Sequence, residues 1–126
     1  MRLSLTLAPD ATAPSRARTS IRALSLGLSP HALRDLQLVV SELVTNAVEH
    51  GPRQGIRVEL ELRGRDQVRG EIVDQGATGA PAILSAECDP ENLGLRVVDE
   101  LTESWGVRAG STHVWFEMRK DPATPA

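Results

Sequence analysis

The segment SPHALRDLQLVVSELVTNAVEHG, residues 29–51, decides how the rest of the chain is interpreted. Ser29 followed by Pro30 is typical of a helix start, because serine caps free backbone N–H groups and proline suits the first helical position. The Gly–Pro pair at 51–52 is a common helix stop. We therefore expect one long helix over residues 30–50.

This helix carries a polar row beside its apolar face. At 100° per residue the apolar side chains share an arc of about 140°, and they are Leu36, Val39, Val40, Leu43, Val44 and Ala47. Glu42, Asn46 and His50 recur every fourth residue along the border of that arc. A border carboxylate can accept a proton and a border carboxamide can hold a hard cation. Taken alone, the helix favours the simpler interpretation, a solvated flank with ordinary i, i+4 contacts.

Shorter patterned segments surround this helix and indicate a sheet. Alternating polar and apolar residues predict strands, and helical spacing predicts two further helices. The expected strands cover residues 2–7, 56–62, 68–73, 105–108 and 112–118, and the expected helices cover 15–26 and 93–101. This order predicts an α+β fold, a two-layer sandwich with a mixed, mostly antiparallel sheet of about five strands and about three helices on one face.

The chain of 126 residues fits one domain, which we assign to residues 1–119, with a tail at 120–126 expected to be disordered. A turn at 64–66 joins two of the strands. Residues 76–92 show no sustained period, and so long a stretch of weak structure in a compact domain is usually functional or mobile.

Composition excludes several classes of function. A net charge of −3 and an aromatic content of 2% argue against nucleic acid as a ligand. The single Cys88 and three scattered histidines offer neither a disulfide nor a structural metal site. We expect a cytoplasmic protein without a membrane span, because there is no signal peptide and no long apolar run. Lys120 is the only lysine, so no Gly-Lys-Ser/Thr phosphate loop exists.

Three short motifs follow the long helix, and each has a functional and a structural interpretation. EIVDQG, residues 71–76, places an acid at a strand end before a glycine, which suits recognition of an exocyclic amine or a plain turn. NLGLRVVD, residues 92–99, places a glycine inside a helix start, where free N–H groups can bind phosphate or the glycine can allow close packing. GSTHVWF, residues 110–116, places a hydroxyl at the start of the last strand.

Together and in this order, these four segments resemble the N box, G1 box, G2 box and final Gly-Thr strand of the GHKL ATPase superfamily. That superfamily includes the ATP-binding domains of gyrase, histidine kinases and chaperones. Over residues 1–119 the chain looks like the small anti-sigma-factor serine kinases of bacteria, and most like the stand-alone regulatory domains of actinobacteria. SELVTNAVEHG and GLRVVDELTESWGV carry this likeness. The resemblance implies a Bergerat-type sandwich with ATP between the helical layer and a lid.

The resemblance also implies roles for the polar row of the long helix. Asn46 would hold Mg²⁺ through its side-chain oxygen, and Glu42 would be the catalytic general base. His50 matches a position that is often histidine before glycine in the subfamily, and a structural role at the helix end is at least as well supported.

The remaining motifs would hold the nucleotide. Asp74 would bind the adenine amino group, with Gly76 allowing close approach, and Thr112 would support the adenine end. The phosphates would meet the helix start formed by Asn92, Leu93, Gly94 and Leu95.

The chain departs from the subfamily pattern at the phosphate end. The usual motif is Gly-x-Gly-Leu, whereas this chain has asparagine at the first position, Asn92. Asparagine adopts left-handed conformations more readily than most residues, which favours survival of the turn, but the phosphate contacts can be weaker. The lid at 77–91 is short, and only Gly79 matches a fuller G1 box. Adenine recognition is therefore better supported than phosphate chemistry.

We expect an ATP- and Mg²⁺-binding regulator that acts as a serine/threonine-protein kinase on an anti-sigma-factor antagonist, with a sigma factor as a second client. The alternative is a non-catalytic module that holds nucleotide or sequesters a sigma factor or antagonist. Simple ATP hydrolysis differs only in the acceptor, which would be water. The resemblance leaves homodimer formation open.

Overall fold

The computed structural model describes residues 1–50, 55–64, 66–74, 95–107 and 113–119. The elements follow the predicted order of strands and helices. They are β1 (Arg2–Leu7), α1 (Ala13–Ile21), the 3₁₀ segment η1 (Arg22–Gly27), α2 (Pro30–His50), β2 (Ile56–Arg63), β3 (Gln67–Asp74), α3 (Leu95–Leu101), β4 (Ser104–Val107) and β5 (His113–Arg119). The expected loop at 76–92 and tail at 120–126 lie outside the described residues.

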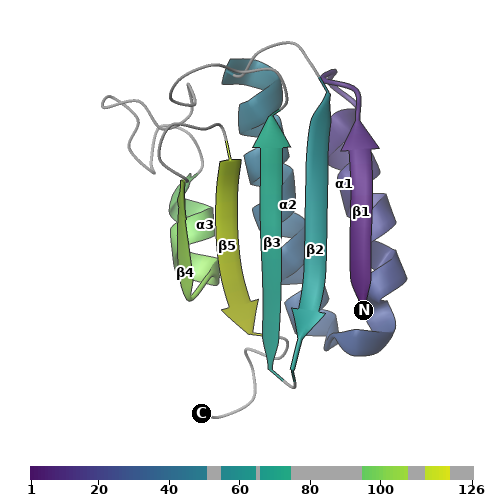
Figure 1. Ribbon diagram of the computed structural model, residues 1–126, viewed down its shortest axis with the longest axis vertical. Coiled ribbons are helices and arrows are strands. Elements are labelled where there is room, and N and C mark those ends of the chain that lie inside the picture. The colour runs from purple at the N-terminus through teal and green to yellow at the C-terminus, as the bar shows by residue number, and fades with distance from the viewer. Residues whose placement is uncertain (51–54, 65, 75–94, 108–112, 120–126) are drawn as a thin grey trace.

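The five described strands form one sheet in the order β1-β2-β3-β5-β4. Each pair of neighbouring strands within the described ranges is antiparallel. The predicted turn between β2 and β3 places Gly64 at a φ of 57°, a left-handed conformation that glycine adopts without strain. Figure 1 shows the helices packed on one face of this sheet. The predicted two-layer α+β sandwich is confirmed, and its described part is antiparallel.

The long helix α2 forms as its sequence predicts. The Ser29 hydroxyl accepts a hydrogen bond from the Ala32 N–H at 3.1 Å, which is the expected N-cap contact. The predicted apolar stripe is buried against the sheet, and it comprises Leu36, Val39, Val40, Leu43, Val44 and Ala47. None of the helices in the described ranges is long and apolar enough to cross a membrane.

The helix predicted at residues 15–26 is wrong in its bounds and in its second half. α1 begins at Ala13, because proline is tolerated in a first helical turn, and Pro14 lies there. From Arg22 the chain tightens into η1. A 3₁₀ segment repeats every three residues, so Ile21, Leu24 and Gly27 share one side. The first two are buried and Gly27 lies against the Leu62 side chain.

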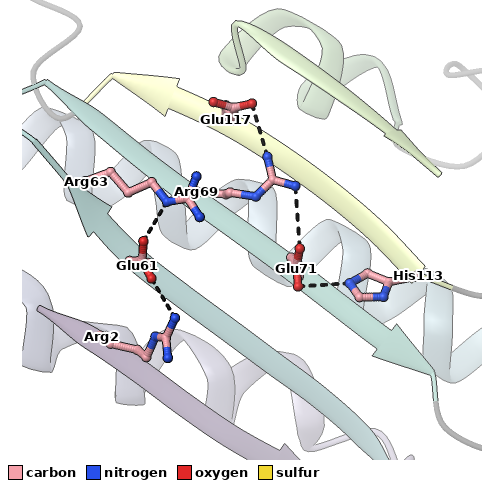
Figure 2. Close-up of polar contacts among 7 residues, drawn as sticks. All are labelled: Arg2, Glu61, Arg63, Arg69, Glu71, His113 and Glu117. Carbon is pink, nitrogen blue, oxygen red and sulfur yellow. Dashed lines mark hydrogen bonds and ion pairs between the residues drawn. The ribbon is translucent and has the colours of Figure 1, made fainter. Parts of the chain in front are cut away.

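The opposite face of the sheet is polar (Figure 2). Glu61 accepts hydrogen bonds from Arg2 at 2.7 Å and from Arg63 at 2.5 Å, and these bonds lower the pKa of the Glu61 carboxyl. Arg69 of β3 donates a hydrogen bond to Glu117 of the neighbouring strand β5 at 3.1 Å. The two exposed pairs of Glu61 each contribute little to stability. In the described part of the chain, the apolar core therefore lies between the sheet and the helices.

Candidate functional site

Four elements bring their ends together at one end of the sheet, the upper end in Figure 1. β3 ends at Asp74 and β5 begins at His113, and Val73 pairs with His113 across the two strands. α2 ends there at His50, behind β3. β4 runs antiparallel to β5, so β4 begins at the opposite end of the sheet. α3 precedes β4 in the chain and leads to that opposite end, so α3 begins at the same end as β5, at Leu95. The sequence motifs assign further nucleotide contacts to residues 75–94 and 108–112, which lie outside the described residues. In the chain these two segments are directly connected to the element ends named above.

Glu42 and Asn46 lie one turn apart in the second half of α2. The rise of about 1.5 Å per residue separates them by about 6 Å along the helix axis. Glu42 is partly buried, in agreement with its predicted position at the border of the apolar stripe. Asn46 is only 3% exposed, so the structure buries it more deeply than a border position suggests.

Asn46 and Ser41 are the two polar side chains of α2 that are buried in the described part of the chain. The Ser41 hydroxyl donates to the Leu38 carbonyl of the same helix at 3.1 Å. Thr45 likewise donates to the Ser41 carbonyl at 2.6 Å. Short hydroxyl side chains satisfy themselves on their own helix in this way. The buried Asn46 side chain is larger, and it lies at the position where the resemblance places the cation ligand, which makes it a candidate for binding.

Only part of the predicted site can be placed. Asp74 is the last residue of β3, opposite Ile56 of β2, and Leu95 is the first residue of α3. Their side chains, like that of His50, are not described. The other predicted contacts lie outside the described residues, and they are Gly76, Asn92, Leu93, Gly94 and Thr112. The structure thus brings the second half of α2, which carries the polar row, and the end of β3 to one end of the molecule.

Two residues near this end had no assigned role in the sequence analysis. The Glu71 carboxylate contacts His113 Nε2 at 3.0 Å across β3 and β5 (Figure 2). The pair links the two strand ends that lead to Asp74 and Thr112. Alternation along each strand predicts that both side chains face outward. Their contact requires the β3–β5 register, which joins segments far apart in the sequence.

A second contact anchors the start of β4 to α3. The Trp105 indole N–H donates to the Asp99 carboxylate at 3.0 Å. The Thr102 hydroxyl donates to the Val98 carbonyl at 2.7 Å as α3 ends. The Trp105–Asp99 contact and the burial of Val98 hold α3 against the sheet and so position the helix start at Leu95.

Residues 6–120 match the family of histidine kinase-like ATPase domains. The chain belongs to this family. The resemblance stated from its motifs is thereby confirmed, and family membership implies ATP binding. A comparison with curated proteins found no match.

A solved structure of the RsbU and RsbW domains of Rv1364c from Mycobacterium tuberculosis is similar to this ATPase-family domain. The two are 25% identical with a TM-score of 0.71, and the match covers 100% of this chain and 34% of that chain. This chain therefore spans about a third of the length of that protein. The match agrees with the fold expected of an anti-sigma-factor kinase.

The described residues fit a bound Mg²⁺-nucleotide. No group of three or more histidine, cysteine or acidic side chains that could hold a metal by itself occurs in the described ranges. Mg²⁺ in ATP sites commonly takes one or two protein ligands and completes its shell with phosphate oxygens and water. The buried Asn46 carboxamide would supply one such oxygen. The first turn of α3 carries no acid that would repel a phosphate.

Proposed function

We propose that this domain binds Mg²⁺-ATP between the second half of α2 and the end of β3, and transfers the γ-phosphoryl group to a serine or threonine of an anti-sigma-factor antagonist. The observation that carries the proposal is the pair Glu42 and Asn46. One is a partly buried carboxylate and the other a buried carboxamide, one helical turn apart, in a domain of an ATPase family.

Each residue has a distinct task in this proposal. Asn46 binds the cation through its side-chain oxygen. Asp74 accepts a hydrogen bond from the adenine amino group, and Gly76 leaves room for the base. Residues 92–95 and Thr112 bind the phosphates and the adenine end. Mg²⁺-ATP, when bound, supplies the phosphoryl group and a cation that offsets its charge.

Glu42 acts as the general base. Its carboxylate would accept the proton of the acceptor hydroxyl as the hydroxyl oxygen bonds to the γ-phosphorus. The bond from that phosphorus to the β–γ bridging oxygen would break, so that ADP leaves. Phosphoryl transfer depends mainly on positioning and on charge stabilisation, so proton acceptance by Glu42 is one contribution among several. A positioned base typically accelerates such a reaction by about 10²–10⁴-fold.

The assignment of the acceptor rests on the likeness of SELVTNAVEHG and GLRVVDELTESWGV to anti-sigma-factor kinases. The match over the whole chain to a structure that includes an RsbW domain is in line with it. A sigma factor is a second client under the same likeness. Asn92, which replaces the usual glycine of the phosphate motif, favours the alternative of a module that holds nucleotide or partner without catalysis.

Transfer of labelled phosphate from ATP to a purified candidate antagonist tests the proposal. Glu42→Gln should lower the transfer rate by about 10²-fold or more while nucleotide binding survives. Asp35→Asn is the matched control, because Asp35 lies on the same helix and contacts only His31 at 3.5 Å among the ion pairs of the described residues. Its transfer rate should stay unchanged.

Unchanged transfer by Glu42→Gln would remove Glu42 from the role of base. Nucleotide binding without transfer to the antagonist would replace the kinase by the non-catalytic module. Phosphate release without labelled antagonist would make water the acceptor.

A further inference from the structure

A groove runs along the sheet edge that lies farthest from β4. It is lined by residues 5–7 of β1 and by Ser15, Arg16, Thr19 and Ser20 of α1. Its volume is about 400 Å³. β1 is the edge strand here, with β2 on one side and no other described strand on the other. A groove between an edge strand and a helix is the geometry in which extended peptides add a strand to a sheet.

The register shows which backbone groups of β1 face this open edge. The Met1 carbonyl accepts a hydrogen bond from the Leu62 N–H at 2.9 Å. Directly opposed residues of an antiparallel pair alternate between hydrogen-bonded and non-hydrogen-bonded positions. Leu3, Leu5 and Leu7 therefore bond to β2. The backbone N–H and C=O groups of the alternate residues, Arg2, Ser4 and Thr6, point away from the sheet.

Nothing in the sequence of β1 protects this edge. Natural edge strands are usually kept short or carry charges, proline or bulges that prevent further pairing. β1 has six residues without a proline, and its one charged side chain, Arg2, is hydrogen bonded to Glu61 of β2 (Figure 2). The Ser4 hydroxyl likewise donates a hydrogen bond to the Glu59 carboxylate of β2 at 2.9 Å. The outward backbone groups are left accessible to a partner.

The wall of the groove is basic. Among the described residues, Arg16 is the only charged side chain that lines it. Residues 13–27, which form α1 and η1, contain three arginines and no acidic residue. The carboxylate of Asp10, which precedes α1, accepts a hydrogen bond from the backbone N–H of Thr12 at 2.8 Å and keeps its negative charge near Arg16. The three arginines outnumber this one carboxylate, so an acidic segment meets a net positive charge.

We propose that this groove binds an extended, acidic segment of a partner protein as an additional strand beside β1. Hydrogen bonds to the backbone of Ser4 and Thr6 hold the segment, and Arg16 pairs with a carboxylate on it. The surface is separate from the proposed nucleotide site, because β2 lies between β1 and β3, the nearest strand that flanks that site. It gives the domain a second way to hold a partner.

Titration of the domain with two capped peptides, each roughly eight residues long, tests the proposal. One peptide alternates glutamate with valine, and the other alternates lysine with valine. Amide hydrogen exchange, followed by NMR, should slow about tenfold or more at Ser4 and Thr6 with the acidic peptide and stay unchanged with the basic one. We expect a Kd below about 1 mM, which is typical of a weak strand addition.

Two variants, each with a matched control, separate the contributions of backbone and charge. Thr6→Pro removes an outward N–H at a site where an edge strand tolerates proline, and should weaken peptide binding about tenfold; Thr6→Val keeps the N–H and should not. Arg16→Glu should reverse the preference in favour of the basic peptide. Arg22→Glu, an equal charge change outside the groove lining, should preserve it. If Thr6→Pro fails to fold, Arg16→Glu decides the question.

Equal binding of both peptides, or no protection of Ser4 and Thr6 at millimolar acidic peptide, would overturn the proposal. In the absence of peptide, slower amide exchange at Ser4 and Thr6 at higher protein concentration would also overturn the proposal, because the edge strand would then pair with a second copy of the chain. Stabilisation by Mg²⁺-ATP should be the same in all four variants, so this test is independent of the nucleotide site.

Discussion

Replacing Gly70 by alanine should destabilise the sheet by overpacking. Gly70 lies opposite Phe116 on the buried face of β3 and β5. An added Cβ would collide with three ring atoms of Phe116, the farthest at 2.9 Å, and Phe116 is 0% exposed and cannot swing into solvent. Overpacking costs about 1–3 kcal/mol, and so tight a contact belongs in the upper half of that range. At about 2.1 cal/mol/K per residue, the melting temperature should fall by about 8–11 °C.

Thermal unfolding followed by circular dichroism measures this change. Gly106→Ala is the control, because its Cβ would meet Trp115 at 3.2 Å and Trp115 is partly exposed and can move. Its effect should be clearly smaller. Phe116→Leu should relieve the clash, so the double variant with Gly70→Ala should be more stable than additivity predicts by about 0.5 kcal/mol or more. A Gly70→Ala melting temperature within about 2 °C of the parent would refute the packing of Phe116 over this glycine.

Two further predictions concern the helix cap and the outer face. Ser29→Ala removes the cap of α2 and should cost about 1 kcal/mol, or about 4 °C in melting temperature, whereas Ser25→Ala should have little effect. Because hydrogen bonds from Arg63 and Arg2 lower the pKa of Glu61, its contribution to stability is present above the unfolded pKa, near 4.5, and is lost as the pH falls through the lower folded value. Glu61→Gln should therefore flatten the loss of melting temperature below about pH 4.5, and a pH profile parallel to that of the parent would contradict this.

Local signals were enough to predict α2 and the hairpin of β2 and β3. Ser29 caps the helix and the apolar residues repeat at its period, so neighbouring residues determine both its start and its buried face. The alternation of residues 56–62 and the glycine at 64 determine the hairpin in the same way. The deep burial of Asn46 was not predicted, because it depends on what packs against the flank of α2 and not on the helix alone.

The arrangement of the last strands could not be obtained locally. β5 inserts between β3 and β4, so the strand next to β3 is not the next one in sequence. The contact of Glu71 with His113 follows from that insertion. η1 was also missed, since Leu24 fits a helical period as well as a 3₁₀ period. The roles of Gly76, Gly94 and Thr112 rest on motif likeness, because those residues lie outside the described ranges.

Thermal unfolding with and without Mg²⁺-ATP tests the central claim most directly. Ligand at 100 times its Kd should stabilise the parent domain by about 2.7 kcal/mol, or about 10 °C. Asp74→Asn should abolish this shift through loss of the adenine contact, whereas Asp66→Asn, an exposed change beside the turn at the other end of β3, should retain it. No shift in the parent at millimolar Mg²⁺-ATP, or an equal shift in Asp74→Asn, would contradict the assignment of this end of the sheet as the nucleotide site.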